Sequence, residues 1–349
     1  MQSVGGKAMN LIVAGLKRDW LPIAICLLFA AGTGLVRNYY NLPGLGFNSF
    51  LTNAILVASG IFICGVFWLG RMLAVDRPDR PLAYLNTNSE VAAVIGNMVK
   101  TLMLILPVCL FLPSFGLLKS LVGFLQPYSW DALFIRWDVI IHGQDAWLLL
   151  QPLIGYPIIT FFFAIAYQLW ILFLYIAFPL VCLWRGNRKL RQQMIISFLS
   201  CWIIIGVAMA NWLASVGPCF LEPMIGDPRF QDQMAYLATV NDQYPLFVLD
   251  VQKELLDSHL AGNHGLGRGI SAMPSMHVSV AFLFALFGWH VSRWLGIVAT
   301  IYCVVILLGS VHLGYHYAVD GYVAIVATFI IWITAGLFVK NSILKTSAP

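Results

Sequence analysis

The chain has 349 residues, of which 60% are hydrophobic and only 10% are charged, and its formal net charge is +5. A mean hydropathy of +0.84 excludes an ordinary soluble domain, and repeated apolar runs of about 20 residues indicate a polytopic helical membrane protein. Most of the seven cysteines lie inside these runs, so neither a disulfide framework nor a cysteine-based zinc site is expected. The basic excess is interpreted as membrane sidedness and not as a sign of a nucleic-acid partner.

Eight apolar runs are predicted to be membrane-spanning helices. The predicted fold class is therefore all-α, a polytopic membrane helical bundle of about eight transmembrane helices. Only Val291-Ser292-Arg293 separates the sixth span from the seventh, which predicts a tight helical hairpin. The predicted spans cover residues 20–36, 51–70, 98–118, 157–183, 194–214, 275–290, 294–310 and 317–339.

The distribution of lysine and arginine predicts the sidedness of the spans. With the N-terminus inside, most basic residues fall in inner segments, and the inner loop after the fourth span is especially basic. Both termini of this multi-pass protein are therefore expected to be cytoplasmic, with the opposite face toward the periplasm, the cell exterior or an organelle lumen. The basic residues of that inner loop are Arg185, Arg188, Lys189 and Arg191.

Two predicted outer segments are more than simple connections. Residues 128–155 mix tryptophans with acidic residues, which is typical of a helix lying at the membrane interface. Within this segment Asp131 and Asp138 are interpreted as part of a solvated helix face, with a grip on an acceptor head group as the alternative. Residues 215–274 form an outer loop that leads directly to His277, and loops of such length in compact proteins are usually functional.

Ionisable residues occur where two of the C-terminal spans begin. His277 opens the sixth span, and His316 and Asp320 open the eighth. One helical hairpin joins these two starts, so both are predicted to return to the same outer surface. Ionisable groups at such places in a membrane protein are energetically costly and usually functional. We interpret the pair of helix starts as a phosphoryl-transfer site.

Each residue of this group suits one task in phosphoryl transfer. Asp320 lies four residues after His316, so a shared helix face would let the carboxylate fix one ring nitrogen and leave the other free to attack. Ser275 is a good N-cap, and the helix start that follows offers backbone N–H groups to a phosphate. His277 in that first turn is placed to protonate a leaving oxygen and then to deprotonate an acceptor.

The motif Pro-Ser-Met-His ending at His277, followed by His-Tyr-Ala-Val-Asp from His316 to Asp320, resembles the type 2 phosphatidic acid phosphatase superfamily. The resemblance implies that His316 forms a phosphohistidine, that Asp320 orients its ring and that His277 is the general acid–base residue, with no metal and no cofactor. It also implies a six-helix catalytic core, here residues 98–345, preceded by an N-terminal extension, residues 1–97, with two transmembrane helices.

Two phosphate-binding elements typical of that superfamily are missing or replaced. No Lys-x6-Arg-Pro motif is recognised on the predicted outer side, and Gly309-Ser310 stand where Ser-Arg precedes the second histidine. The pattern is more similar to the branch that contains inositol phosphorylceramide synthase, which transfers a phospho-alcohol head group between lipids. Arg268 is favoured as a replacement ligand, and His312 either contacts phosphate or caps the seventh span. The candidate phosphate-binding residues are Ser275, Arg268, His312 and Ser310.

The predicted function is that of an integral-membrane lipid phosphotransferase, which moves a phospho-alcohol or phosphate group through a phosphohistidine at the outer membrane face. Its partners would be a membrane lipid donor and a lipid or small-alcohol acceptor. The alternative with the same first half-reaction is a lipid phosphate phosphatase, of the phosphatidic acid or polyprenyl pyrophosphate type, in which water is the acceptor.

Two other classes of function stay open at this point. His312, His316 and Asp320 at positions i, i+4 and i+8 would share one helical face and could hold zinc, which would indicate a metal-dependent enzyme. A transporter or lipid carrier without chemistry is the other class, and broken helices with buried charges at mid-membrane would favour it.

Overall fold

The computed structural model describes residues 4–42, 47–262 and 269–346, and every regular element in these ranges is a helix. In these ranges, seven helical segments are long and apolar enough to cross a membrane, and two of them, Pro157–Leu183 and Arg188–Trp212, each join several consecutive elements. The predicted sixth span corresponds to Met276–Val291, an apolar helix that is shorter than the other seven. The prediction of an all-α polytopic membrane bundle is therefore confirmed.

The chain divides into two compact units, one of residues 1–114 and 172–195 and the other of residues 115–171 and 196–349. Two helices, α4 (Ser89–Lys119) and α9 (Arg188–Ile203), continue from the first unit into the second. The other elements of the first unit are α1 (Val4–Tyr39), α2 (Phe47–Asp76), α3 (Pro81–Thr87), the π-helix η1 (Phe173–Ala177) and α8 (Phe178–Leu183).

A buried carboxylate at an interruption of α1 joins helices of the first unit. Asp19 has non-helical backbone angles, and Pro22 follows it; a proline there lacks the N–H that would bond the carbonyl of Arg18. Gln192 Nε2 donates to that carbonyl at 3.0 Å, and Arg191 Nη1 binds Asp19 Oδ1 at 2.6 Å. Side chains of α9 thus satisfy both the freed carbonyl and the buried charge, as burial of such groups requires.

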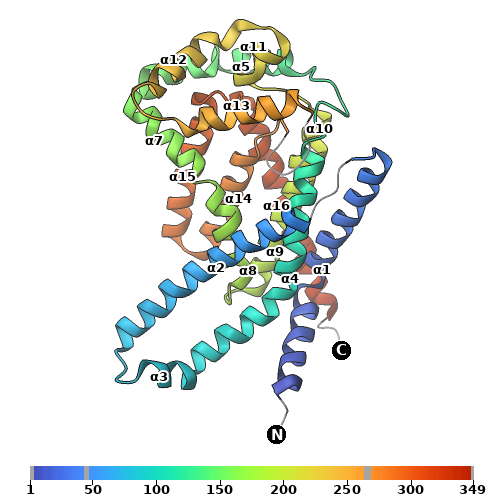
Figure 1. The fold of residues 1–349 in the computed structure, drawn as a ribbon, viewed down its shortest axis with the longest axis vertical. Helices are drawn as coiled ribbons and strands as arrows, with labels where there is room; N and C mark the ends of the chain where they lie inside the picture. The colour runs from blue at the N-terminus through green and yellow to red at the C-terminus, as the bar shows by residue number, and fades with distance from the viewer. Residues whose placement is uncertain (1–3, 43–46, 263–268, 347–349) are drawn as a thin grey trace. The chain divides into compact units, whose positions relative to one another are not determined.

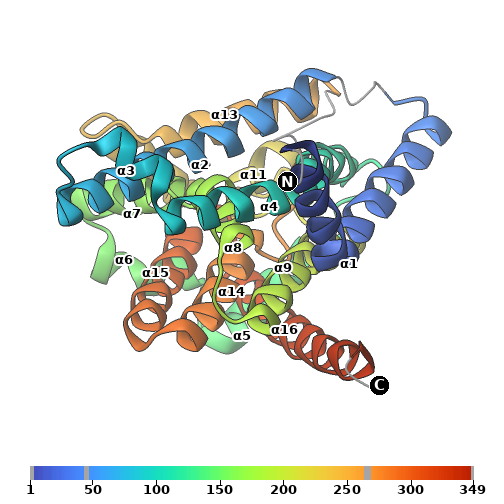
Figure 2. The same ribbon diagram turned by 90° about the horizontal axis from the view of Figure 1, so that it is seen from below.

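In the second unit, α14 (Met276–Val291) and α15 (Arg293–His312) form the predicted tight hairpin. Ser292 caps α15, because its Oγ accepts the backbone N–H of Leu295 at 3.2 Å. Gly288 lies where the two backbones come close, since a Cβ there would be 3.0 Å from the Leu295 carbonyl oxygen. Figure 1 and Figure 2 show α14 and α15 side by side. The chain then turns into α16 (Ala318–Thr346).

The remaining helices of the second unit are short, and several of them gather at one end of it (Figure 1). They are α5 (Asp131–His142), α6 (Ala146–Ile154), α7 (Pro157–Gln168), the π-helix η2 (Ile204–Met209), α10 (Ala210–Trp212), α11 (Pro218–Ile225), the 3₁₀ turn η3 (Pro228–Phe230), α12 (Gln231–Asn241) and α13 (Phe247–Leu260).

Two buried carboxylates of α5 fix the start of α16. Asp138 accepts the backbone N–H groups of Ala318 and Val319 at 3.0 and 2.9 Å, and Asp131 accepts the Tyr317 hydroxyl at 2.8 Å. Burial raises the pKa of both carboxyl groups, and the hydrogen bonds that they accept act in the opposite direction. The interpretation of Asp131 and Asp138 as part of a solvated helix face is therefore wrong. They are buried acceptors that hold α16 in place.

Candidate active site

His316 lies in the turn before α16 and faces a carboxylate from the first turn of that helix. Its Nδ1 is 3.2 Å from Asp320 Oδ2, and the same oxygen accepts the backbone N–H of Tyr317 at 3.0 Å. The predicted contact between His316 and Asp320 is present, but it does not arise from a shared helix face. α16 begins after His316, and the Asp320 side chain reaches back over the first turn of the helix. This geometry favours the tautomer with a proton on Nδ1 and a lone pair on Nε2.

The imidazole of His316 is neutral at neutral pH. Burial lowers its pKa to about 3, the charge of Lys119 acts in the same direction, and an interaction with the Ala272 backbone opposes both. An unperturbed histidine has a pKa of about 6.5. The contact with Asp320 is therefore a hydrogen bond from a neutral ring, and a neutral ring is the form in which a histidine nitrogen can act as a nucleophile.

His277 lies in the first turn of α14 and faces His316. Their ring centroids are 6.4 Å apart, and the ring planes are inclined by 60°. Ser275 caps α14 by accepting the N–H of Val278 at 3.4 Å, while its own backbone N–H donates to the carbonyl of Asp320 at 3.2 Å. The start of α14 is thus bonded directly to the start of α16, and the two histidines meet as the hairpin topology requires.

Aromatic side chains enclose His277. The Tyr167 ring stacks on it at a centroid distance of 4.3 Å, and the Trp170 ring lies 4.2 Å away, with its Nε1 donating to the His277 carbonyl at 3.0 Å. Tyr315 also stacks on Tyr167, at 5.0 Å. The Tyr167 hydroxyl is buried and has no hydrogen-bond partner within the described part of the chain. These rings fix the orientation of His277 and limit the access of water to it.

Lys119 is a cation of the site that the sequence analysis missed. Its Nζ donates to the Ser271 carbonyl at 3.4 Å, and its charge acts on His316. The chain passes close to it at Gly269, whose φ is +120° and where a Cβ would lie 2.5 Å from the Lys119 carbonyl oxygen. Lys119 begins the sequence Lys-x6-Gln-Pro, ending at Pro127, which keeps the spacing of the Lys-x6-Arg-Pro motif with glutamine in place of arginine. A search that tolerated this replacement would have found it.

The other predicted phosphate ligands are engaged within the protein or lie outside the described residues. His312 Nε2 is 2.8 Å from Thr160 Oγ1. Ser310 Oγ donates to a carbonyl of its own helix at 2.8 Å, and the Ser310 carbonyl accepts the His316 backbone N–H at 3.1 Å. Arg268 belongs to the segment that the structure does not describe. Ser275 serves as the cap of α14. A phosphate-binding role for these four residues stays a prediction.

The proposed zinc-binding face does not exist as predicted. α15 ends at His312 and α16 begins at Ala318, so His312, His316 and Asp320 do not lie on one continuous helix. His312 instead bonds Thr160. Among the described residues, no group of three or more histidine, cysteine, aspartate or glutamate side chains is arranged to hold a metal ion.

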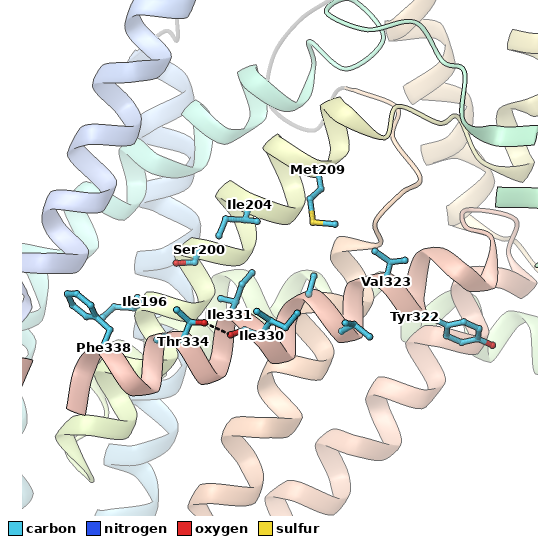
Figure 3. A pocket seen from close by; sticks show the side chains of 13 residues that line it. Ile196, Ser200, Ile204, Met209, Tyr322, Val323, Ile330, Ile331, Thr334 and Phe338 are labelled. Atoms are coloured by element: carbon cyan, nitrogen blue, oxygen red, sulfur yellow. Dashed lines mark hydrogen bonds between the residues drawn. The ribbon is translucent and has the colours of Figure 1, made fainter. Parts of the chain in front are cut away.

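An apolar groove of about 760 Å³ runs along α16, the helix that carries Asp320. One wall consists of α9 and η2, from Ile196 to Met209, and the other consists of α16, from Tyr322 to Phe338 (Figure 3). At a rise of about 1.5 Å per residue, the α16 wall is about 24 Å long. The hydrocarbon core of a bilayer is about 30 Å thick. A lipid chain spans one of the two leaflets, about half of that thickness, so the groove is long enough for an extended chain, and its lining is mainly apolar.

The fold and the site define a polytopic helical membrane protein in which two histidines and an aspartate meet at adjoining helix starts. A family model for the PAP2 superfamily matches residues 132–334, more than half of the chain, and this range includes His277, His316 and Asp320. The chain belongs to the PAP2 superfamily, whose members are in general phosphatases or phosphotransferases that act on lipid phosphates. No curated protein and no solved structure matches the chain.

Proposed function

We propose that the protein is an integral-membrane lipid phosphotransferase that works through a phosphohistidine on His316. The observation that carries this proposal is the meeting of two helix starts: a neutral His316 that is hydrogen-bonded to Asp320, with the His277 ring centroid 6.4 Å away. A phosphoryl group bound between the rings would have a nucleophile on one side and an acid–base group on the other, both at the short range that such chemistry requires.

In the first half-reaction, Nε2 of His316 attacks the phosphorus of the lipid donor. A P–N bond forms, and the P–O bond to the lipid alcohol breaks. His277, protonated under the influence of the incoming phosphate charge, gives its proton to the leaving oxygen. Lys119 offsets negative charge on the phosphoryl oxygens, and Asp320 stabilises the positive charge that develops on His316. The products are a phosphohistidine and a free lipid alcohol.

In the second half-reaction, an acceptor hydroxyl replaces the lipid alcohol. His277, now neutral, takes the hydroxyl proton, the acceptor oxygen attacks phosphorus, and the P–N bond breaks to restore His316. The aromatic enclosure by Tyr167 and Trp170 favours an alcohol over water as the acceptor. The Tyr167 hydroxyl, which is unpartnered within the described part of the chain, is available to a substrate oxygen.

The groove along α16 supports a lipid substrate. The α16 wall of the groove begins at Tyr322, two residues after Asp320, so one end of the groove lies at the same level along α16 as the phosphoryl-transfer site. We assign the groove to a hydrocarbon chain of the donor or acceptor lipid. The inositol phosphorylceramide synthase-like chemistry inferred from the motif, transfer of a phospho-alcohol head group between lipids, is compatible with this arrangement.

Product analysis tests the proposal. The purified protein is incubated with a phospholipid donor labelled in its head group, with and without an added lipid alcohol, and the lipid products are separated by thin-layer chromatography. We expect the label to move to the added alcohol, and His316→Ala to abolish the transfer. Release of water-soluble phosphate or phospho-alcohol alone, with no labelled new lipid, would refute the transferase and favour the phosphatase.

A further inference from the structure

Basic side chains line a cavity in the first unit. The cavity has a volume of about 520 Å³ and lies among α1, the beginning of α4 and the connection from α8 to α9. None of its lining residues is an aspartate or a glutamate, and none belongs to the histidine site. The cations that line it are Arg18, Lys100, Arg185, Arg188 and Arg191.

Only part of this positive charge is neutralised by the protein. Asp19 binds both Arg18 and Arg191, at 2.8 and 2.6 Å. A second carboxylate, Glu90, binds Arg185 at 2.6 Å. Five cations against two carboxylates leave an excess of three positive charges.

Lys100 and Arg188 supply two of these three uncompensated positive charges. Neither forms an ion pair with a carboxylate of residues 4–42, 47–262 or 269–346. Arg188 is exposed and Lys100 is half-buried. Both are therefore accessible to an anion that enters the cavity.

Apart from Asn97, whose Oδ1 accepts from Arg18 Nη1 at 2.7 Å, the rest of the lining carries no polar side chain. It includes Leu11, Ala92, Ala93 and Trp184, and Gly96, where an added Cβ would meet only the end of the Leu11 side chain, at 3.8 Å. Tryptophan is enriched where membrane helices meet the aqueous interface. A cation cluster for a soluble anion would not need such a lining, whereas a lipid presents its phosphate and its glycerol and acyl region together.

We propose that this cavity is a binding site for the head group of an anionic phospholipid. Arginine and lysine are the side chains that bind phosphate by charge-assisted hydrogen bonds, and basic pockets between the ends of membrane helices suit anionic lipid head groups. Lys100 and Arg188 would bind the phosphate, and the apolar residues would contact the adjoining part of the lipid. The site goes beyond the proposed phosphoryl transfer and does not depend on it.

Thermal unfolding of the full-length protein in detergent tests the proposal, because a ligand of the folded state raises the unfolding temperature. The probes are dioleoyl phosphatidylglycerol, dioleoyl phosphatidylcholine and inorganic phosphate. We expect a saturable rise with phosphatidylglycerol and none with the other two at equal concentration. At about fivefold per cation, Lys100→Gln/Arg188→Gln should raise the half-saturating concentration about 25-fold.

Two further variants distinguish a specific binding site from a general effect of net charge. Gly96→Leu fills the cavity and removes no charge, so it should also weaken the effect of phosphatidylglycerol. Lys17→Gln/Lys189→Gln removes two exposed cations of the same unit that do not line the cavity, and should leave the titration unchanged.

Four results would overturn the proposal. An equal response to phosphatidylcholine would show a general lipid effect, and an equal response to inorganic phosphate would show a site for a soluble anion. An unchanged titration of Lys100→Gln/Arg188→Gln would remove the assigned ligands. An equal weakening by the control variant Lys17→Gln/Lys189→Gln would reduce the effect to net charge.

Discussion

The substitution Asp320→Asn tests how His316 is prepared for attack. In the wild type, Asp320 Oδ2 accepts from both His316 Nδ1 and the Tyr317 N–H. The amide oxygen of asparagine can keep the Tyr317 bond, but the NH₂ group then faces Nδ1 and favours the tautomer with its proton on Nε2. A hydrogen bond to a charged group contributes about 1.5–3 kcal/mol, which corresponds to about a 10- to 150-fold loss of kcat. A fully wrong tautomer would bring the loss toward the about 10⁴-fold seen in serine proteases.

The pH dependence sharpens this prediction. Because burial lowers the pKa of His316 to about 3, below its ordinary value of about 6.5, the ring is neutral from pH 5 to pH 7. The removal of a carboxylate disfavours the protonated ring further, so the ring stays neutral in the variant. The fold-loss should therefore be constant across this range.

The assay measures initial rates with a labelled lipid donor in mixed micelles at several pH values. The matched control is Asp242→Asn, which changes an exposed aspartate and should leave kcat unchanged. If Asp320→Asn keeps more than half of the wild-type kcat, or recovers at one end of the pH range, the orienting role of Asp320 is refuted.

Three further predictions concern the surroundings of the triad. Lys119→Gln should raise the KM for the lipid phosphate about tenfold, because a charge-assisted contact is lost; initial rates at varied donor concentration measure this, and an unchanged KM would contradict it. Asp138→Ala leaves the N–H groups of Ala318 and Val319 without their acceptor, which should destabilise the protein by about 1–3 kcal/mol. An unfolding temperature equal to that of the wild type would show that Asp138 does not stabilise the start of α16. Ala327→Phe narrows the groove and should slow the turnover of long-chain donors more than that of short-chain donors, whereas equal slowing of both would argue against a lipid chain there.

The helical framework was predictable from the sequence because its cause is local. Long apolar runs indicate membrane spans, and the seam at residues 291–293 is too short for anything but a tight connection between α14 and α15. This hairpin alone was enough to predict that His277 and His316 lie close together. A break between the seventh and eighth spans was predicted at residues 311–316, but His316 was expected to share a helix with Asp320, whereas α16 begins only at Ala318.

The parts of the site that were missed depend on tertiary contacts. Asp131 and Asp138 are polar residues on a short amphipathic segment, and only the packing of α16 against α5 turns them into buried caps. Lys119 ends a span and looks like an ordinary flanking cation, until Gly269 brings the segment before α14 against its backbone. The pairing of His312 with Thr160 is equally invisible in the sequence, because it joins residues from separate helices.

Trapping the phosphorylated enzyme tests the proposed phosphohistidine mechanism most directly. The wild-type protein is mixed, without an acceptor alcohol, with a donor that carries radiolabelled phosphorus, quenched in alkali, digested and analysed by mass spectrometry. We predict acid-labile, alkali-stable label on His316, which is absent in His316→Ala and decays in the wild type when an acceptor alcohol is added. Label on another residue, or full turnover by the His316→Ala protein, would contradict the phosphohistidine mechanism.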